Sequence, residues 1–256
     1  MRRPLFALSL AAVALLSAGA KRPEGPEVLV VSDIVAPGDP ARLRPAKDRP
    51  IHYVVLGGGE RTLGDAWAGE KMPDKAALTA EIQRALSSQG FTLTQVGGPK
   101  PDIALLFSYG SANISSIEIS DTDPTTGETT TSTIDFNRRE IAQLVGAFKA
   151  DRKLLMTSDA DRINEAARDD RVYIFVAAFE VESLLKKKPV VLWRTRISIP
   201  SRRHSLPEAM RVMLASAAPY FATETDLPKF IEDADRRKAE VHIGTPTVVE
   251  PPPAKK

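Results

Sequence analysis

The residues best suited to hold another molecule gather in one stretch of the chain, from Ser183 to His204. This stretch carries seven Lys and Arg residues and no Asp or Glu. Such a run attracts anions even in a protein whose overall charge is close to zero. The anion would be a lipid, a glycan or the acidic surface of a protein. The candidate contact residues are Lys186, Lys187, Lys188, Arg196, Arg202 and Arg203.

The same basic stretch also has a structural explanation. The apolar segments on either side of Lys187 predict a hairpin, and if the turn centres there, Glu180 lies opposite Arg194. An ion pair across the two strands then accounts for the arginine. A lysine-rich turn also protects a strand edge from unwanted pairing. The structural explanation is the simpler of the two, and both stay open at this point.

Two further segments resemble ligand-binding loops but lack the spacing that binding requires. Residues 57–59 (GGG) follow an apolar strand, where a phosphate loop would begin, but Glu60 comes next and would repel a phosphate. Residues 121–128 (DTDPTTGE) place Thr126 and Ser132 where a calcium loop needs Gly and Glu. We therefore expect a flexible turn at the first segment and a polar hairpin tip at the second.

Histidine and cysteine usage limits the possible chemistry. The chain has no Cys, which excludes a disulfide framework, an iron–sulfur cluster and a thiol nucleophile. His52, His204 and His242 lie far apart and form no zinc-binding motif, and no G-x-S-x-G nucleophile motif is present. A catalytic triad built from distant residues stays open, because triads are recognised by geometry. We expect no metal, no cofactor and no enzymatic activity.

The two tryptophans raise the possibility of stacking on a glycan. Trp193 alternates with apolar neighbours, which predicts a place in the core. Trp67 lies in a Gly- and Ala-rich segment, where it either forms an exposed aromatic surface or covers the core. Trp67 is therefore the candidate exposed aromatic.

Residues 1–20 have the pattern of a secretory signal peptide. Arg2 and Arg3 precede an apolar run from Leu5 to Leu16, and residues 18–20 (AGA) form a small-x-small cleavage site. The apolar run is shorter than the roughly 20 residues that span a bilayer. We therefore expect cleavage before Lys21 and no membrane-spanning segment in the mature chain. The leader indicates the periplasm of a Gram-negative bacterium, with secretion as the alternative.

Removal of the leader also removes the net charge of the chain. The formal charge of +2 comes from the two leader arginines, which leaves 33 basic and 33 acidic residues in the mature chain. This balance gives no reason to expect nucleic acid as a partner.

Local patterns predict an α+β fold with a mainly antiparallel sheet and helices packed on one face. The expected strands are 51–56, 91–96, 103–109, 114–120, 129–136, 172–183 and 189–199. The expected helices are 74–89, 138–149, 159–169 and 206–218. The domains follow from these elements: a signal peptide at 1–20, a Pro-rich linker at 21–50, one α+β domain at 51–235 and a Pro-rich disordered tail at 236–256. Within the linker, the segment VLVVSDIV at 28–35 has a strand-like pattern. Whether it joins the sheet or stays part of the extended linker is left open at this point.

Several of these segments, taken in order, resemble a known family. They are the strand 51–56, the helix that closes on Leu86 and Gly90-Phe91, the Pro101-Asp102-Ile103 entry to an apolar strand, and the late hairpin with VVLWR at 190–194. Over residues 50–222 the chain resembles the bacterial envelope family called domain of unknown function 4136. Many members resemble lipoproteins, whereas this chain has no Cys for acylation. The resemblance implies an envelope protein of unassigned activity and no catalytic residues.

These observations lead to one expected function and one alternative. We expect an exported cell-envelope protein that acts without catalysis as an interaction or assembly accessory, with an envelope protein as partner. The alternative is a module that binds an anionic small molecule, lipid or glycan through the basic hairpin 186–203.

Overall fold

The structure is a computed structural model that describes residues 25–37, 39–65, 70–150 and 158–232. Its strands are β1 (Val28–Ile34), β2 (Ile51–Glu60), β3 (Phe91–Leu93), β4 (Ile103–Ala112), β5 (Ser115–Thr122), β6 (Thr129–Phe136), β7 (Arg171–Glu180), β8 (Val191–Pro200) and β9 (Lys229–Ile231). Its helices are α1 (Lys75–Ser87), α2 (Arg138–Val145), α3 (Ala147–Ala150), α4 (Ser158–Ala166), α5 (Val181–Leu185) and α6 (Leu206–Ala217).

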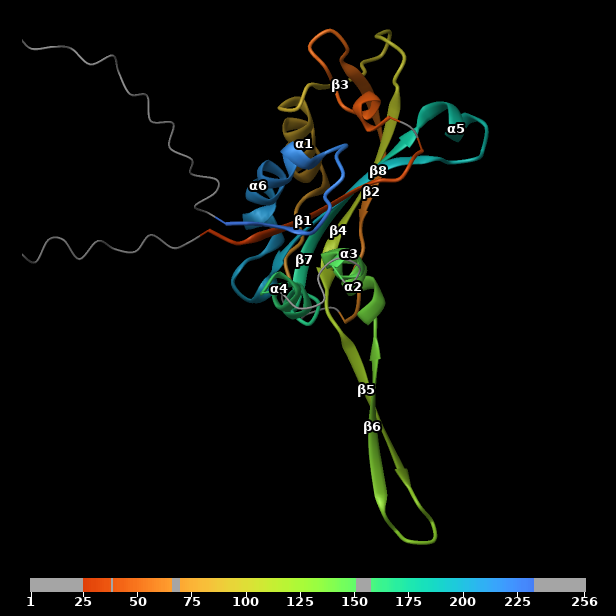
Figure 1. Cartoon of the computed structure of the whole chain (residues 1–256), viewed down its shortest axis with the longest axis vertical. Helices are drawn as coiled ribbons and strands as arrows, with labels where there is room; N and C mark the ends of the chain where they lie inside the picture. Colours follow the sequence, from red (N-terminus) through yellow and green to blue (C-terminus); the bar gives the residue numbers. More distant parts are fainter. Residues whose placement is uncertain (1–24, 38, 66–69, 151–157, 233–256) are drawn as a thin grey trace, which may run out of the picture.

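One large sheet forms the body of the protein, with a separate two-stranded sheet beside it (Figure 1). The strands of the large sheet follow the order β3-β2-β4-β7-β8-β1-β9. β2 runs parallel to β3 and β4, and the other neighbouring strands are antiparallel. The expected mixture of helices with a mainly antiparallel sheet is therefore confirmed.

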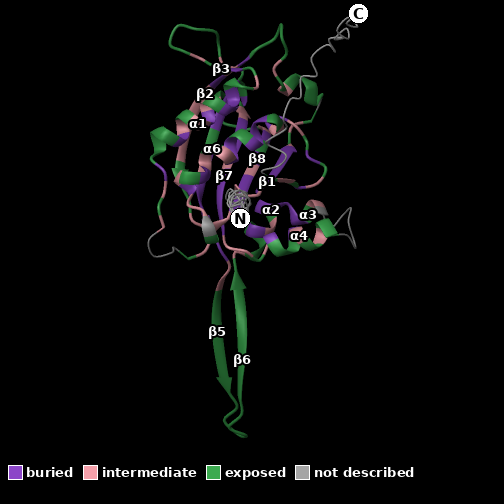
Figure 2. Cartoon of the chain, turned by 90° about the vertical axis from the view of Figure 1, so that its left-hand side faces the viewer, coloured by how far each residue is buried: buried purple, intermediate pink, exposed green. Residues whose placement is uncertain are grey.

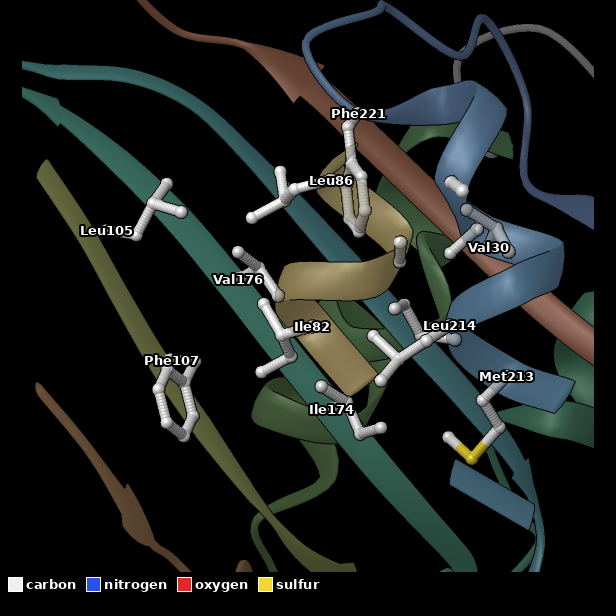
Figure 3. Packing of buried hydrophobic residues seen from close by; sticks show 14 of the residues in the cluster. Val30, Ile82, Leu86, Leu105, Phe107, Ile174, Val176, Met213, Leu214 and Phe221 are labelled. Carbon is white, nitrogen blue, oxygen red and sulfur yellow. The ribbon is translucent and has the colours of Figure 1, made fainter. Parts of the chain in front are cut away.

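Helices cover both faces of this sheet. Val30 on β1 packs in one cluster with Ile82 of α1 and Leu214 of α6 (Figure 3). The next residue back along the chain, Leu29, belongs to a second cluster with residues of α2 and α4. Successive side chains of a strand point to opposite faces, so the two helical groups lie on opposite sides. The expectation that the helices pack on one face is wrong for α2 and α4.

The N-terminal segment supplies an interior strand of the sheet. β1 lies between β8 and β9, with Val30 opposite Ile197. Residues from Val28 to Val31 are at most 1% exposed. Such burial on both faces fits the unbroken apolar pattern of the segment. The expected Pro-rich linker at 21–50 therefore contains a strand of the sheet, and the alternative in which 28–35 pairs is the one observed.

The three glycines at 57–59 form part of strand β2 rather than a turn. A bulge in the pairing of β2 with β4 lies just before them. The ring of Phe107 on β4 packs directly over Gly58, and a Cβ at this position would lie 2.1 Å from that ring. The expected flexible turn is therefore wrong, because the missing side chain makes room for a core aromatic ring.

Local signals set the helix boundaries. The Asp74 carboxylate accepts the backbone N–H of Ala77 at 3.0 Å and so caps α1. Gly90, with φ of 84°, follows the end of that helix. The expected helix at 138–149 is instead two helices, α2 and α3, because Gly146 between them has φ of 76°.

Both expected hairpins are present. β7 and β8 pair as predicted, and the short helix α5 precedes Lys186–Lys188 in their connection. β5 and β6 form a two-stranded ribbon that projects far from the body (Figure 1). We call this ribbon, residues 115–136, the arm, and we call Lys186–Lys188 the lysine turn.

In the described part of the chain, the helices are all too short or too polar to cross a membrane. The signal peptide at 1–20, Trp67 and the tail at 236–256 lie outside the described residues.

Candidate functional site

The six predicted anion contacts do not form one surface. The lysine turn precedes β8, Arg196 lies within that strand, and Arg202 follows its far end. A ten-residue strand is about 33 Å long, so the two ends of the basic stretch are far apart. Arg202 is mostly exposed and lies 3.7 Å from Asp169. Arg203 belongs to the short 3-10 turn Ser201–Arg203.

The two arginines of β8 form ion pairs with Asp33 of β1. Arg194 donates from Nε to Asp33 Oδ2 at 2.9 Å, and Arg196 donates to the same oxygen. The residue opposite Arg194 on β7 is Ala177, not the expected Glu180. A cross-strand ion pair does explain Arg194, but its partner comes from the strand on the other side.

Lys149 completes a compact ionic network around Asp33. Its Nζ lies 2.7 Å from Asp33 Oδ1 and contacts Glu224 as well. It also donates to the backbone carbonyl of Ser32 at 2.9 Å. Burial alone raises the pKa of Asp33, but Arg196, Lys149 and Arg194 together outweigh it and hold this pKa below its usual value. Asp33 is therefore a structural anion that joins β1, β8 and α3.

Two cavities border this network. The first is about 430 Å³, and its charged lining consists of three cations and three carboxylates. The second is about 340 Å³ and lies between α2 and the sheet, with Leu106 and Phe175 in its wall. The arginines that line both cavities, Arg194 and Arg196, are already paired with Asp33. The charged lining of the first cavity is therefore balanced, whereas the second is lined by three arginines and one carboxylate, Glu140.

One polar group in the wall of the second cavity is hydrogen-bonded within the fold. The hydroxyl of Tyr173, which lines the second cavity, donates to the carbonyl of Arg61 at 2.6 Å, and burial raises the pKa of Tyr173. Within residues 25–232, as far as they are described, no three His, Asp or Glu side chains are close enough to hold a metal ion.

The arm has one apolar face that the rest of the protein leaves exposed. Ile117 on β5 lies directly opposite Ile134 on β6, and Ser115 lies opposite Phe136. Because side chains alternate between the faces of a strand, Ile119 shares this face with them. The four apolar side chains are between 43% and 53% exposed. Figure 2 shows the arm as exposed along nearly its whole length, and residues 116–136 are all exposed.

The opposite face of the arm is polar and internally hydrogen-bonded. Ser116 donates to Asp135 at 2.8 Å, and the hydroxyls of Ser120 and Thr131 lie 3.2 Å apart. At the tip, the Asp123 carboxylate accepts backbone N–H groups from the turn, and these bonds lower its pKa. The expected polar hairpin tip is confirmed. The two faces make the arm an amphipathic ribbon.

The arm is also uniformly acidic. Residues 114–137 contain five Asp and Glu residues and no Lys or Arg. Asp135, at the base of the arm, pairs with Arg138 at 3.0 Å. The carboxylates nearer the tip are Glu118, Asp121, Asp123 and Glu128, and none forms an ion pair with a described residue. The arm therefore combines an exposed apolar face with carboxylates that have no ion-pair partner among the described residues.

Sequence reasoning predicted the arm as a hairpin but did not identify it as a candidate site. The signal was present: Ile117 and Ile119 alternate with polar residues, and so do Ile134 and Phe136. Such alternation ordinarily means one face packed on a core. What the sequence does not reveal is that the ribbon extends away from the core.

Comparisons with known proteins give no family. No family model matches the chain, and no curated protein matches it. A solved dodecamer of a PelC variant from Paraburkholderia phytofirmans is similar over 77% of this chain and 99% of that chain, with 8% identity and a TM-score of 0.34. That level of similarity supports no transfer of assembly or function. The resemblance to domain of unknown function 4136 stays a prediction.

Proposed function

We propose that the protein is an exported, non-enzymatic interaction or assembly accessory of the bacterial cell envelope and that it holds its partner with the arm. The observation that carries the proposal is the apolar face formed by Ile117, Ile119, Ile134 and Phe136 on an otherwise polar ribbon.

The physical argument concerns the stability of such a ribbon. A two-stranded ribbon on its own is at best marginally stable in water. Exposed contiguous apolar surface bordered by polar residues is characteristic of interaction sites. A partner that covers the apolar face of the arm would remove this surface from water and order the ribbon in one step. The partner would carry basic residues, because the tip of the arm carries unpaired carboxylates.

Export rests on the leader-like pattern of residues 1–20. The periplasm is the proposed compartment, and secretion is the alternative. An exported protein with a protruding contact element fits an accessory role better than a catalytic one.

The alternative function, binding of an anionic small molecule, lipid or glycan through residues 186–203, has weaker support. Arg194 and Arg196 within that range are paired with Asp33. The exposed lysines of the turn are separated from Arg202 by the length of β8. A ligand would therefore meet only part of the predicted basic surface.

The experiment is cross-linking in the native host, followed by mass spectrometry of the envelope fraction. The wild type is compared with a variant carrying Ile117→Thr and Ile134→Thr, which removes apolar surface while retaining β-forming residues. A variant with Ser120→Ala and Thr131→Ala on the polar face is the matched control. We expect a cross-linked protein partner that the first variant loses and the control keeps. Equal cross-linking by all three proteins would overturn the proposal.

A further inference from the structure

We propose that the arm of one copy docks on the lysine turn of a second copy, so that the protein associates with itself head to tail. This inference rests on the proposed function, because it uses the arm as the contact, and it names the partner as the chain itself.

The first argument is charge complementarity. The arm carries five acidic residues and no basic ones, whereas the lysine turn carries three basic residues and no acidic ones. Lys187 and Lys188 are exposed and form no ion pair with a described residue. Near the tip of the arm, Asp121 and Glu128 are likewise exposed and form none. Two segments of opposite sign are thus both left unneutralised within one molecule.

The second argument is apolar surface on both segments. Next to the lysine turn, Leu185 is 75% exposed and Val190 is 39% exposed. On the arm, the isoleucines lie on the body side of the acidic tip. Each segment therefore presents apolar side chains beside charged ones, as the apolar centre and polar rim of a protein interface require.

The third argument is that the two segments cannot meet within one molecule. β4 and β7 are antiparallel, with Ile103 opposite Glu180 and Ala112 opposite Arg171. The arm begins beyond Ala112, and the lysine turn follows Glu180, so they leave from opposite ends of this strand pair (Figure 1). Ten residues of strand separate those ends by about 33 Å. Contact between arm and turn is therefore possible only between copies, in a heterologous arrangement.

Two arms packed against each other are the obvious competing dimer. That arrangement would cover the isoleucines, but it would bring ten carboxylates together without a basic residue from either arm. Like charges placed side by side in an interface oppose association. The basic end of a second copy covers the same apolar face and supplies the opposite charge.

The test is sedimentation velocity of the purified mature chain over a range of concentration and salt. A turn variant carries Lys186→Glu and Lys188→Glu, and an arm variant carries Asp121→Lys and Glu128→Lys. We expect wild-type self-association that weakens with salt and an association constant at least about tenfold lower for each variant alone. An equimolar mixture of the two variants should associate again, because the unchanged acidic arm of the turn variant then meets the unchanged lysine turn of the arm variant. Arg202→Glu, on the same basic stretch beyond the far end of β8, is the control that should associate like the wild type.

The possible failures are distinguishable. Self-association that persists in the turn variant would overturn the head-to-tail contact and indicate arm-to-arm packing. A wild type that stays monomeric at every concentration would overturn self-association altogether. If cross-linking in the host then joins the arm to a different, basic protein, the proposed function stands and only the identity of the partner is wrong.

Discussion

Asp33 and Arg194 lie 161 positions apart in the sequence, yet the Arg194 Nε donates to the Asp33 carboxylate at 2.9 Å. The pair joins the first strand of the sheet to β8, where the two residues are direct cross-strand neighbours. Lys149 of α3 forms an ion pair with the same carboxylate. The ionic network therefore fixes the N-terminal strand and the α2–α3 layer onto the body that carries the arm and the lysine turn.

Substitution of Asp33 should destabilise the fold. Asp33→Asn leaves Arg194, Arg196 and Lys149 without their shared anion in a site where Arg196 and Asp33 are each 11% exposed. Loss of one partner from such a buried pair costs about 3 kcal/mol or more of the free energy of unfolding. Denaturant unfolding of the wild type and of Asp33→Asn measures this loss in the free energy of unfolding. The control is Asp169→Asn, whose partner Arg202 is 77% exposed, and it should change stability by less than about 1 kcal/mol. Equal effects of the two substitutions would contradict this role for Asp33.

The same carboxylate predicts how stability depends on pH. The pKa of Asp33 in the folded protein lies below its usual value of 3.8. The contribution of the ionised Asp33 to the free energy of unfolding is therefore fully present above the unfolded-state pKa of this group. This contribution is lost as pH falls through the folded-state pKa. The difference in the free energy of unfolding between the wild type and Asp33→Asn should be constant above about pH 5 and shrink in more acidic solution. A difference that stays constant down to about pH 2 would show that Asp33 is not a depressed, ion-paired acid.

Local interactions explain which elements were predictable. Helix α1 follows from its apolar spacing, from the Asp74 cap and from Gly90, all of which are adjacent in sequence. The β7–β8 hairpin was predictable for the same reason. The ion-pair partner of Arg194 was not predictable, because Asp33 lies on β1, far from β8 in the sequence. No local pattern specifies the pairing of these two strands.

The prediction of a turn at residues 57–59 is wrong for a different reason. Three glycines in a row ordinarily indicate a turn, but here they continue β2 under the ring of Phe107. The cause is tertiary packing, which a sequence pattern does not contain. The arm is a similar case, because its alternation predicts a hairpin but not whether a core covers the hairpin.

The packing at Gly58 gives a direct mutational test. A methyl group at Gly58 meets the buried ring of Phe107, whereas a methyl group at Gly59 would have nothing within 4 Å, and neither glycine has a positive φ. Gly58→Ala should lower the free energy of unfolding by about 1–3 kcal/mol, since overpacking displaces core side chains. Gly59→Ala should be neutral or slightly stabilising. Thermal unfolding of both variants checks this, and a Gly58→Ala protein as stable as the wild type would contradict the observed packing.

The central claim is that the apolar face of the arm is a contact surface. Its most direct test is a photo-reactive phenylalanine analogue placed at Ile119 and, as a matched control, at Thr131 on the polar face, each irradiated in the native host. The account predicts strong cross-links to another polypeptide from position 119 and far fewer from position 131. If the other polypeptide is a second copy, the cross-linked peptide should include the region around Leu185. Equal labelling from both positions, or none from position 119, would contradict the claim.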